Sequence, residues 1–230
     1  MIRLRRIDIP GFPYHIYARG NNQQIIFQKD KDRAVYLKYL RECHQWFRFK
    51  LHAYALMDNH IHLLLEMLEG SSLGKLMHRL HLKYARYSNR AFERRGHAFE
   101  SRYHANIIES DRYFMTVERY IHLNPVRAKM VARPEQYRWS SYADRLALRH
   151  SDWLYHDMTL SYFGGNTQQR LSAYKTYTED AIGTPEEWSH EDLGKTRFFG
   201  SSHFVKRINE LIEPGSTMRL NAEVNLVQRT

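Results

Sequence analysis

The chain has 230 residues, of which 43% are hydrophobic, and its formal net charge is +10 with a sequence pI near 9.7. This length allows one domain of ordinary size with an appendage, and the excess of cations favours a polyanionic partner, more often a nucleic acid than a membrane surface. The single cysteine, Cys43, excludes an internal disulfide framework and a cysteine-based zinc module.

The amino-terminal sequence MIRLRRIDIPGF carries basic residues but lacks the apolar stretch and small-residue cleavage site of a signal peptide. No segment approaches eighteen consecutive apolar residues, so we expect no membrane span and no membrane partner. Together with the single cysteine, these features predict a cytoplasmic protein.

Strands and helices alternate through the first 145 residues. The pattern predicts strands at 13–20, 49–57, 60–67 and 102–109, and helices at about 30–47, at 71–89 and from Asp111 onward after the capping residue Ser110. Asp58 and Asn59 occupy the tight turn of a hairpin. Because this order contains the split βαβ pattern, we expect an α+β fold with a ferredoxin-like antiparallel sheet, helices on one face and the other face open to a ligand.

The character of the sequence changes after about Tyr142, where glycine and aromatic residues punctuate SDWLYHDMTLSYFGG. Helical periodicity returns at 167–182 and 201–213, and the tail at 214–230 is typical of a poorly ordered segment. We therefore expect a domain at 1–145 and a mostly helical extension at 146–230. Two roles stay open for this extension: contact with DNA, or bracing of the first domain.

The sequence ALMDNHIHLLLE, at 55–66, places two histidines two positions apart. Side chains of a strand alternate between faces, so His60 and His62 share one face. In a helix they would point about 200° apart, so only a strand lets both imidazoles bind one metal ion. The alternative is two ordinary histidines on a solvated face. Glu66 lies on the same face and is a weak candidate for a partner of the pair. His104, on another strand, is favoured for a structural role, with a place near the site as the alternative.

Two stripes run along the predicted helix at 71–89, one apolar and one basic. The basic stripe has spacings of four, four, three and four residues and consists of Lys75, Arg79, Lys83, Arg86 and Arg90. Like charges at these spacings repel by roughly 0.2–0.5 kcal/mol per pair unless an anion lies against them. We therefore expect the stripe to bind DNA or RNA, with a solvated helix face as the alternative.

The sequence DRYFMTVERYIHLNPVRAKMV, at 111–131, places Tyr120 and Asn124 four residues apart. On a continuous helix the two side chains share one face. Pro125 disfavours helical geometry at Asn124, so a helix break there is the alternative. In either case the Asn124 amide projects near Tyr120.

Four stretches resemble the single-tyrosine HUH transposases, in particular the REP-associated tyrosine transposases, which are related to the transposases of single-strand insertion sequences. They are YALMDNHIHLLLE, GHAFESRYHANIIES, YIHLNPVRAKMV and YRWSSY, and YARGNNQQIIF near the amino terminus belongs with them. The resemblance spans roughly residues 10–145 and does not extend beyond about 150. It implies the HUH nuclease fold, an antiparallel sheet with the two histidines at its centre.

The resemblance also implies an activity: a single-stranded DNA endonuclease and strand transferase of DNA transposition and recombination. Tyr120 matches the nucleophile, His60 and His62 match the metal-binding pair, and Asn124 falls at the third ligand, where some relatives have glutamine. The implied cofactor is Mg²⁺ or Mn²⁺, although the ligand types alone would equally suit Zn²⁺. The implied substrate is single-stranded or hairpin DNA near hairpin-forming repeats, and the implied products are a covalent 5′-phosphotyrosine and a free 3′-hydroxyl.

Two rival functions fit parts of the sequence. A DNA- or RNA-binding regulator would keep the fold without cleaving, although the intact His60, His62 and Tyr120 argue against it. A metal-dependent hydrolase that uses water would often place further Asp and His ligands directly after HIH, and none follow there. A covalent DNA adduct on Tyr120 separates the three functions. The recognised DNA sequence and the oligomeric state, monomer or homodimer, stay open.

Overall fold

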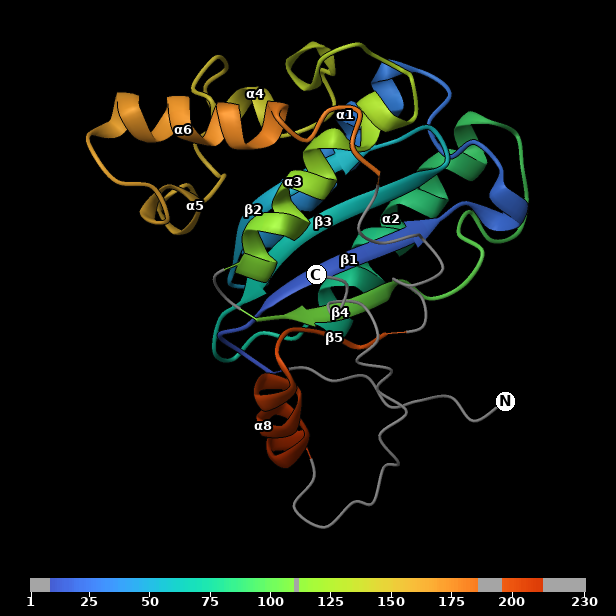
Figure 1. The fold of residues 1–230 in the computed structure, drawn as a ribbon. Helices are drawn as coiled ribbons and strands as arrows, with labels where there is room; N and C mark the ends of the chain where they lie inside the picture. Colours follow the sequence, from blue (N-terminus) through green and yellow to red (C-terminus); the bar gives the residue numbers. More distant parts are fainter. Residues whose placement is uncertain (1–8, 110–111, 186–195, 213–230) are drawn as a thin grey trace.

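The computed structural model describes residues 9–109, 112–185 and 196–212. Its centre is a sheet of five strands in the order β2-β3-β1-β4-β5 (Figure 1). The strands are β1 (Pro13–Arg19), β2 (Phe49–Leu56), β3 (His60–Met67), β4 (His104–Ile108) and β5 (Phe198–Phe199). The first four strands pair antiparallel, whereas β5 runs parallel to β4 at the edge of the sheet.

The described residues form seven α-helices; five follow the predicted ranges to within a few residues, and two short ones after residue 140 had no predicted range. The seven helices are α1 (Asp30–Glu42), α2 (Leu73–Ala91), α3 (Arg112–Arg127), α4 (Tyr142–Arg145), α5 (Asp157–Ser161), α6 (Thr167–Glu179) and α8 (Ser202–Ile212). Short 3-10 turns occur at Asn21–Gln23, Cys43–Gln45 and Pro134–Gln136. The expected helix start at Ser110 and Asp111 and the expected tail at 214–230 lie outside the described residues.

The two faces of the sheet differ in chemistry because side chains alternate along each strand. Ile16 of β1 and Leu63 of β3 lie opposite each other on the apolar face, and α1 and α2 lie behind this face in Figure 1. On the other face, Tyr17 lies opposite His62 and Arg19 lies opposite His60. The candidate site is therefore on the polar face.

Helix α3 lies over the polar face, in front of β2 and β3 in Figure 1. The α+β class and the ferredoxin-like order of the first four strands are confirmed. Two details of the expected fold are corrected. Helices do not lie on one face only, because α3 covers part of the second face, and the sheet is mixed because β5 pairs parallel with β4. The apolar residues of α3, such as Phe114, Val117, Ile121 and Leu123, are buried on more than one side of the helix, so it needs cover from both the sheet and the C-terminal helices.

Residues after 145 contribute to the same hydrophobic core as the sheet, through side chains such as Tyr174, Phe199 and Ile208. The backbone N–H of Tyr155 donates to the carbonyl of Leu51 in β2 at 2.7 Å. The division of the chain at 145 stays a prediction, and the described part of the extension packs directly on the first domain.

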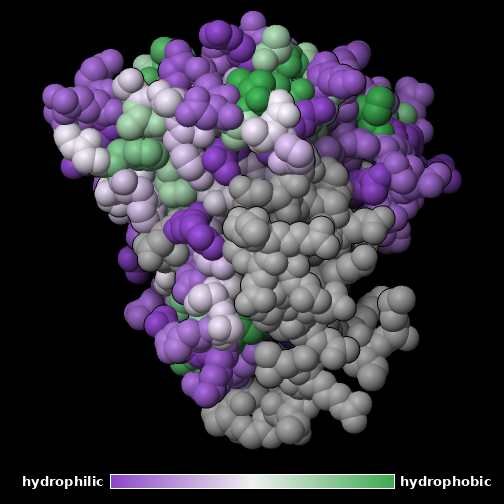
Figure 2. All heavy atoms as spheres, in the orientation of Figure 1, coloured by the Kyte–Doolittle hydropathy of each residue, from purple (hydrophilic) through white to green (hydrophobic). Residues whose placement is uncertain are grey.

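Figure 2 shows that hydrophilic side chains cover most of the coloured surface on this side of the molecule, with hydrophobic side chains in small groups between them. Within the described ranges, no helix combines the length and the apolar composition that a membrane crossing requires.

Candidate active site between the sheet and α3

His60 and His62 share one face of β3, as the alternation of a strand requires. Their ring centroids lie 5.0 Å apart, and the rings are nearly perpendicular, at 89°. Each side chain makes a hydrogen bond through its Nδ1 atom. The His60 Nδ1 lies 2.7 Å from Oδ1 of Asn59, and the His62 Nδ1 lies 3.0 Å from Nε2 of His15 in β1.

Tyr120 reaches the histidines from α3 and is only 3% exposed. Its ring centroid lies 5.5 Å from that of His62 and 5.9 Å from that of His15, in edge-to-face geometry. The hairpin β2–β3 and the helix α3 therefore bring together two residues that are far apart in sequence, His62 and Tyr120.

Asn124 lies one helical turn after Tyr120 and is buried. Helix α3 continues through Pro125 to Arg127, so the continuous-helix alternative holds and the helix has no break at Asn124. The Asn124 amide nitrogen donates to the Tyr120 carbonyl at 3.4 Å. The amide group therefore sits beside the backbone of the candidate nucleophile, within the same turn of helix.

The site contains three residues that the sequence analysis did not single out: His15, Tyr17 and Arg127. The ring centroid of Tyr17 lies 5.2 Å from that of His62 and 5.5 Å from that of His60. Burial raises the pKa of Tyr17, and the nearby Arg19 opposes this shift only in part. The guanidinium carbon of Arg127 lies 5.8 Å from the ring centroid of Tyr120. His15 and Tyr17 share one face of β1 because side chains alternate along a strand, but nothing local in the sequence shows that β1 pairs with β3.

The two weaker candidates lie further from the histidine pair. His104 of β4 is next to Tyr17, at a centroid distance of 6.3 Å. Glu66 forms ion pairs with Lys50 at 3.3 Å and with His52 at 3.6 Å. Glu66 thus has partners other than His60 and His62.

Helix α2, which carries the basic stripe, lies behind the sheet in Figure 1, whereas α3, which carries Tyr120, lies in front of it. Lys83 forms an ion pair with Glu42 of α1 and lies 4.5 Å from the ring centroid of Tyr39. The guanidinium of Arg79 lies 4.3 Å from the ring centroid of Trp46. Lys75, Arg86 and Arg90 are exposed. The structure therefore keeps the five cations on one helix but gives two of them partners on neighbouring elements.

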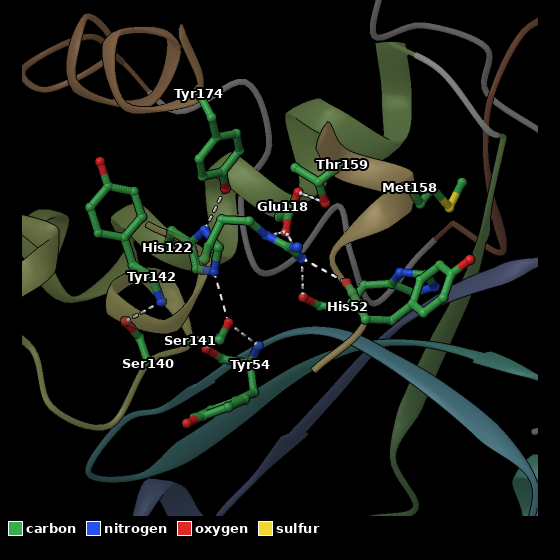
Figure 3. A network of polar contacts seen from close by, with 12 residues as sticks. His52, Tyr54, Glu118, His122, Ser140, Ser141, Tyr142, Met158, Thr159 and Tyr174 are labelled. Carbon is green, nitrogen blue, oxygen red and sulfur yellow. Dashed lines mark hydrogen bonds and ion pairs between the residues drawn. The ribbon is translucent and has the colours of Figure 1, made fainter. Parts of the chain in front are cut away.

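The side of α3 opposite Tyr120, which lies against the edge of β2 and the C-terminal helices, carries a buried ion pair between Glu118 and Arg145; Figure 3 labels Glu118. Glu118 and Arg145 are both fully buried. The Glu118 Oε1 accepts from the Arg145 Nε at 3.0 Å and Nη2 at 2.8 Å, and its Oε2 accepts from the Thr159 hydroxyl at 2.8 Å. Arg145 also donates to the carbonyls of His52 at 2.7 Å and Tyr155 at 3.1 Å.

A second group of contacts on the same side of α3 is centred on His122, as Figure 3 shows. Its Nδ1 lies 2.6 Å from the hydroxyl of Tyr174 in α6, and its Nε2 lies 2.8 Å from the hydroxyl of Ser141. Burial holds the pKa of His122 well below its ordinary value, and the nearby Arg145 adds to the effect. His122 is therefore neutral, and both ring nitrogens are used within the protein.

The geometry of the histidine pair suits a shared metal ion. Two imidazoles that bind one ion at roughly 2.0–2.2 Å with near-tetrahedral angles have ring centroids about 5 Å apart, as His60 and His62 do. Across the part of the chain that the structure describes, no three His, Cys, Asp or Glu side chains group to hold a metal ion. A third protein ligand would therefore come from another residue type, such as the amide of Asn124.

The comparisons with known proteins include one family match and two structural matches. The family model described as "Transposase IS200 like" matches residues 9–124, about half of the chain. Among solved structures, a REP-associated tyrosine transposase bound to a REP hairpin is similar with a TM-score of 0.55 and 15% identity, over 72% of this chain and 93% of that chain. A putative transposase from Deinococcus radiodurans R1 has a TM-score of 0.35 and 18% identity, over 56% of this chain and 91% of that chain. No curated protein matches the sequence.

Proposed function

Because the chain belongs to the family of IS200-like transposases, we propose that it is a single-stranded DNA endonuclease and strand transferase that works through a covalent tyrosine intermediate. The observation that carries this proposal is the edge-to-face contact between Tyr120 and His62, at a centroid distance of 5.5 Å. This contact supports Tyr120 as the nucleophile, because it brings a tyrosine ring from α3 next to a histidine of the pair.

In the proposed reaction the Tyr120 hydroxyl oxygen attacks the scissile phosphorus in line with the leaving oxygen. A bond forms between that oxygen and phosphorus, and the bond from phosphorus to the 3′-oxygen breaks, which leaves a 5′-phosphotyrosine and a free 3′-hydroxyl. The phenolic proton leaves Tyr120, and a proton is gained by the departing 3′-oxygen, so the step is balanced. When a 3′-hydroxyl attacks the phosphotyrosine, the same bonds exchange in reverse and strands are rejoined without ATP.

The residues around Tyr120 have distinct proposed roles. His60, His62 and Asn124 would hold Mg²⁺ or Mn²⁺, which when bound supplies positive charge to polarise the scissile phosphate. Arg127 lies beside the Tyr120 ring and would balance the charge that develops on the phosphate. The packing of α3 between the sheet and the C-terminal helices fixes the position of the Tyr120 ring, which in-line attack requires.

The proposed partner is single-stranded or hairpin DNA, with the exposed cations of α2 contributing backbone contacts. The structural relative is bound to a REP hairpin, and this supports a hairpin as the first substrate to test. The second candidate function, a DNA-binding regulator that does not cleave, is favoured by one observation, the position of α2, which carries the basic stripe, on the opposite side of the sheet from α3.

The test of this proposal is a search for the covalent adduct in matched tyrosine variants. A hairpin oligonucleotide labelled on the 3′ side of the break is incubated with the wild type, Tyr120→Phe and Tyr17→Phe, and label that survives denaturing electrophoresis on protein is mapped. Tyr17 is the right control because it also lies beside His62. We expect an adduct on Tyr120 in the wild type and in Tyr17→Phe, and none in Tyr120→Phe.

Three outcomes contradict parts of the proposal. An adduct in Tyr120→Phe, or one lost only in Tyr17→Phe, assigns the nucleophile to another residue. Binding of the hairpin without any adduct in the wild type supports the regulator instead. Cleavage with a free 5′-phosphate from the first turnover supports a hydrolase that activates water.

A further inference from the structure

The hydrogen bonds of His60 determine which of its nitrogens carries the proton. The Asn59 amide nitrogen donates to the carbonyl of Gln23 at 3.3 Å, which turns the Asn59 Oδ1 toward His60. An amide oxygen only accepts hydrogen bonds, so the His60 Nδ1 at 2.7 Å must be the donor. A neutral His60 therefore carries its proton on Nδ1 and its lone pair on Nε2.

The backbone around Asn59 holds this amide in place. The Asn59 carbonyl accepts from the backbone N–H of Gly20 at 2.7 Å, so the β2–β3 turn is tied to the end of β1. A Cβ atom at position 20 would collide with the carbonyl of Gln24, which explains the glycine there. The orientation of the Asn59 side chain is therefore fixed from both its backbone and its amide nitrogen.

His62 has an equivalent partner in His15. The two rings are nearly parallel, at 11°, with centroids 5.2 Å apart, and the His62 Nδ1 lies 3.0 Å from the His15 Nε2. Both residues are fully buried. One proton lies between the two nitrogens, and only when it sits on the His62 Nδ1 does His62 keep its lone pair on Nε2.

We infer that Asn59 and His15 are positioning residues, which fix the tautomer and ring orientation of His60 and His62 so that each presents the lone pair of Nε2 to a divalent cation. The inference rests on the proposed function, because it concerns the same metal pair. A metal ligand needs an unprotonated nitrogen, and the partner of the other ring nitrogen decides which one that is. The geometry assigns this task to an amide for one histidine and to another imidazole for the other.

The experiment measures Mn²⁺ binding to the metal-free full-length chain by isothermal titration calorimetry, without DNA. Asn59→Ala and His15→Leu remove the acceptors, and we expect each to weaken Mn²⁺ binding about 10–100-fold. Asn59→Asp and His15→Gln are the matched variants, since each keeps an oxygen acceptor near the original atom, and we expect them to bind within a few-fold of the wild type. Thermal melts of all four variants show whether each is folded.

A second measurement needs no variant. Long-range ¹H–¹⁵N NMR spectra of the metal-free wild type distinguish the two neutral tautomers of each histidine, and we expect His60 and His62 to carry their protons on Nδ1. Protons on Nε2 would overturn the inference, as would wild-type Mn²⁺ affinity in folded Asn59→Ala and His15→Leu. A wild type that binds no Mn²⁺ would contradict the metal site of the proposed function itself, and the tautomer spectra would still decide the inference.

Discussion

Helix α3 supplies one residue to each of two histidine–tyrosine pairs, and the two pairs have almost the same ring geometry. One pair lies on the side of Tyr120, which faces the sheet, and the other lies on the opposite side of the helix, called the far side below. On the sheet side, His62 and Tyr120 have centroids 5.5 Å apart at 89°. On the far side, His122 and Tyr174 have centroids 6.0 Å apart at 87°. Residue type and ring geometry therefore do not distinguish a candidate catalytic pair from a structural one.

The partners of the ring nitrogens do distinguish them. His122 uses one nitrogen for Tyr174 and the other for Ser141, so it has no nitrogen left for a ligand. His62 turns Nδ1 to His15 and stands beside a second histidine, His60. The contacts on the far side of α3 hold the helix in place, whereas the proposed chemistry lies on the sheet side. The predictions that follow test this division.

The largest expected effect is on cleavage, from a change on the sheet side. In His62→Ala we expect cleavage of a hairpin oligonucleotide to fall below detection while hairpin binding largely persists, because the change removes a proposed metal ligand and leaves the proposed DNA-binding cations in place. Gel-shift and cleavage assays on the same protein samples measure both. Undiminished cleavage by the wild type in excess EDTA would contradict the metal role.

The next effect is on stability, from a change on the far side. Glu118→Ala leaves the guanidinium of Arg145 buried without its carboxylate, and we expect a loss of about 3–5 kcal/mol in the free energy of unfolding. Asp152→Ala is the control, because it removes a largely exposed partner of Arg41 and such pairs contribute about 1 kcal/mol or less. Urea denaturation measures both. Equal losses in the two variants would mean that the buried ion pair does not hold α3.

The far side also predicts a pH dependence. The pKa of His122 is lowered in the folded protein, so between that value and the unfolded value near 6.5 the unfolded state binds more protons. Burial of neutral His122 therefore costs no stability above about pH 6.5. Below that pH the free energy of unfolding falls by about 1.4 kcal/mol per pH unit for one such histidine. Urea denaturation between pH 7 and pH 5 should show this slope, and it should be shallower in His122→Gln. Parallel profiles for the two proteins would contradict the assignment.

The smallest expected effect is on DNA binding, from changes in the basic stripe of α2. Replacing Arg79, Lys83 and Arg86 with alanine should weaken DNA binding broadly and reduce the slope of log K against log salt by roughly 0.7 for each lost phosphate contact to a single strand. Because Lys83 already pairs with Glu42, we expect Lys83→Ala alone to change the slope less than Arg86→Ala alone. An unchanged slope in the triple variant would remove this stripe from the binding surface.

Local patterns were sufficient for much of the fold and for part of the candidate site. The period of two in HIHLLLEM placed His60 and His62 on one strand face, and the spacing of Tyr120 and Asn124 placed them on one helix face. The partners of these residues were not predictable, because they come from distant elements. His15 reaches His62 through the pairing of β1 with β3, which no local period specifies.

The far side of α3 was missed for the same reason. Glu118 and Thr159 are 41 residues apart, and His122 and Tyr174 are 52 residues apart. The sequence does not show whether a glutamate is buried or exposed, because this depends on a partner that lies far away in the chain. The sequence could therefore propose that the extension braces the first domain but could not name the residues that do so.

The edge strand β5 has a consequence for how the protein is made on the ribosome. Phe198 and Phe199 pair with Ile107 and Ile108 of β4, yet they are synthesised roughly 5–20 s later at typical rates of translation. Throughout this interval the nascent chain presents the edge of β4, and such unpaired edges join to strands of other chains. A protein truncated before residue 198 would lack β5 and leave this edge of β4 without its partner strand, so we expect it to aggregate. The full-length chain pairs the edge with β5.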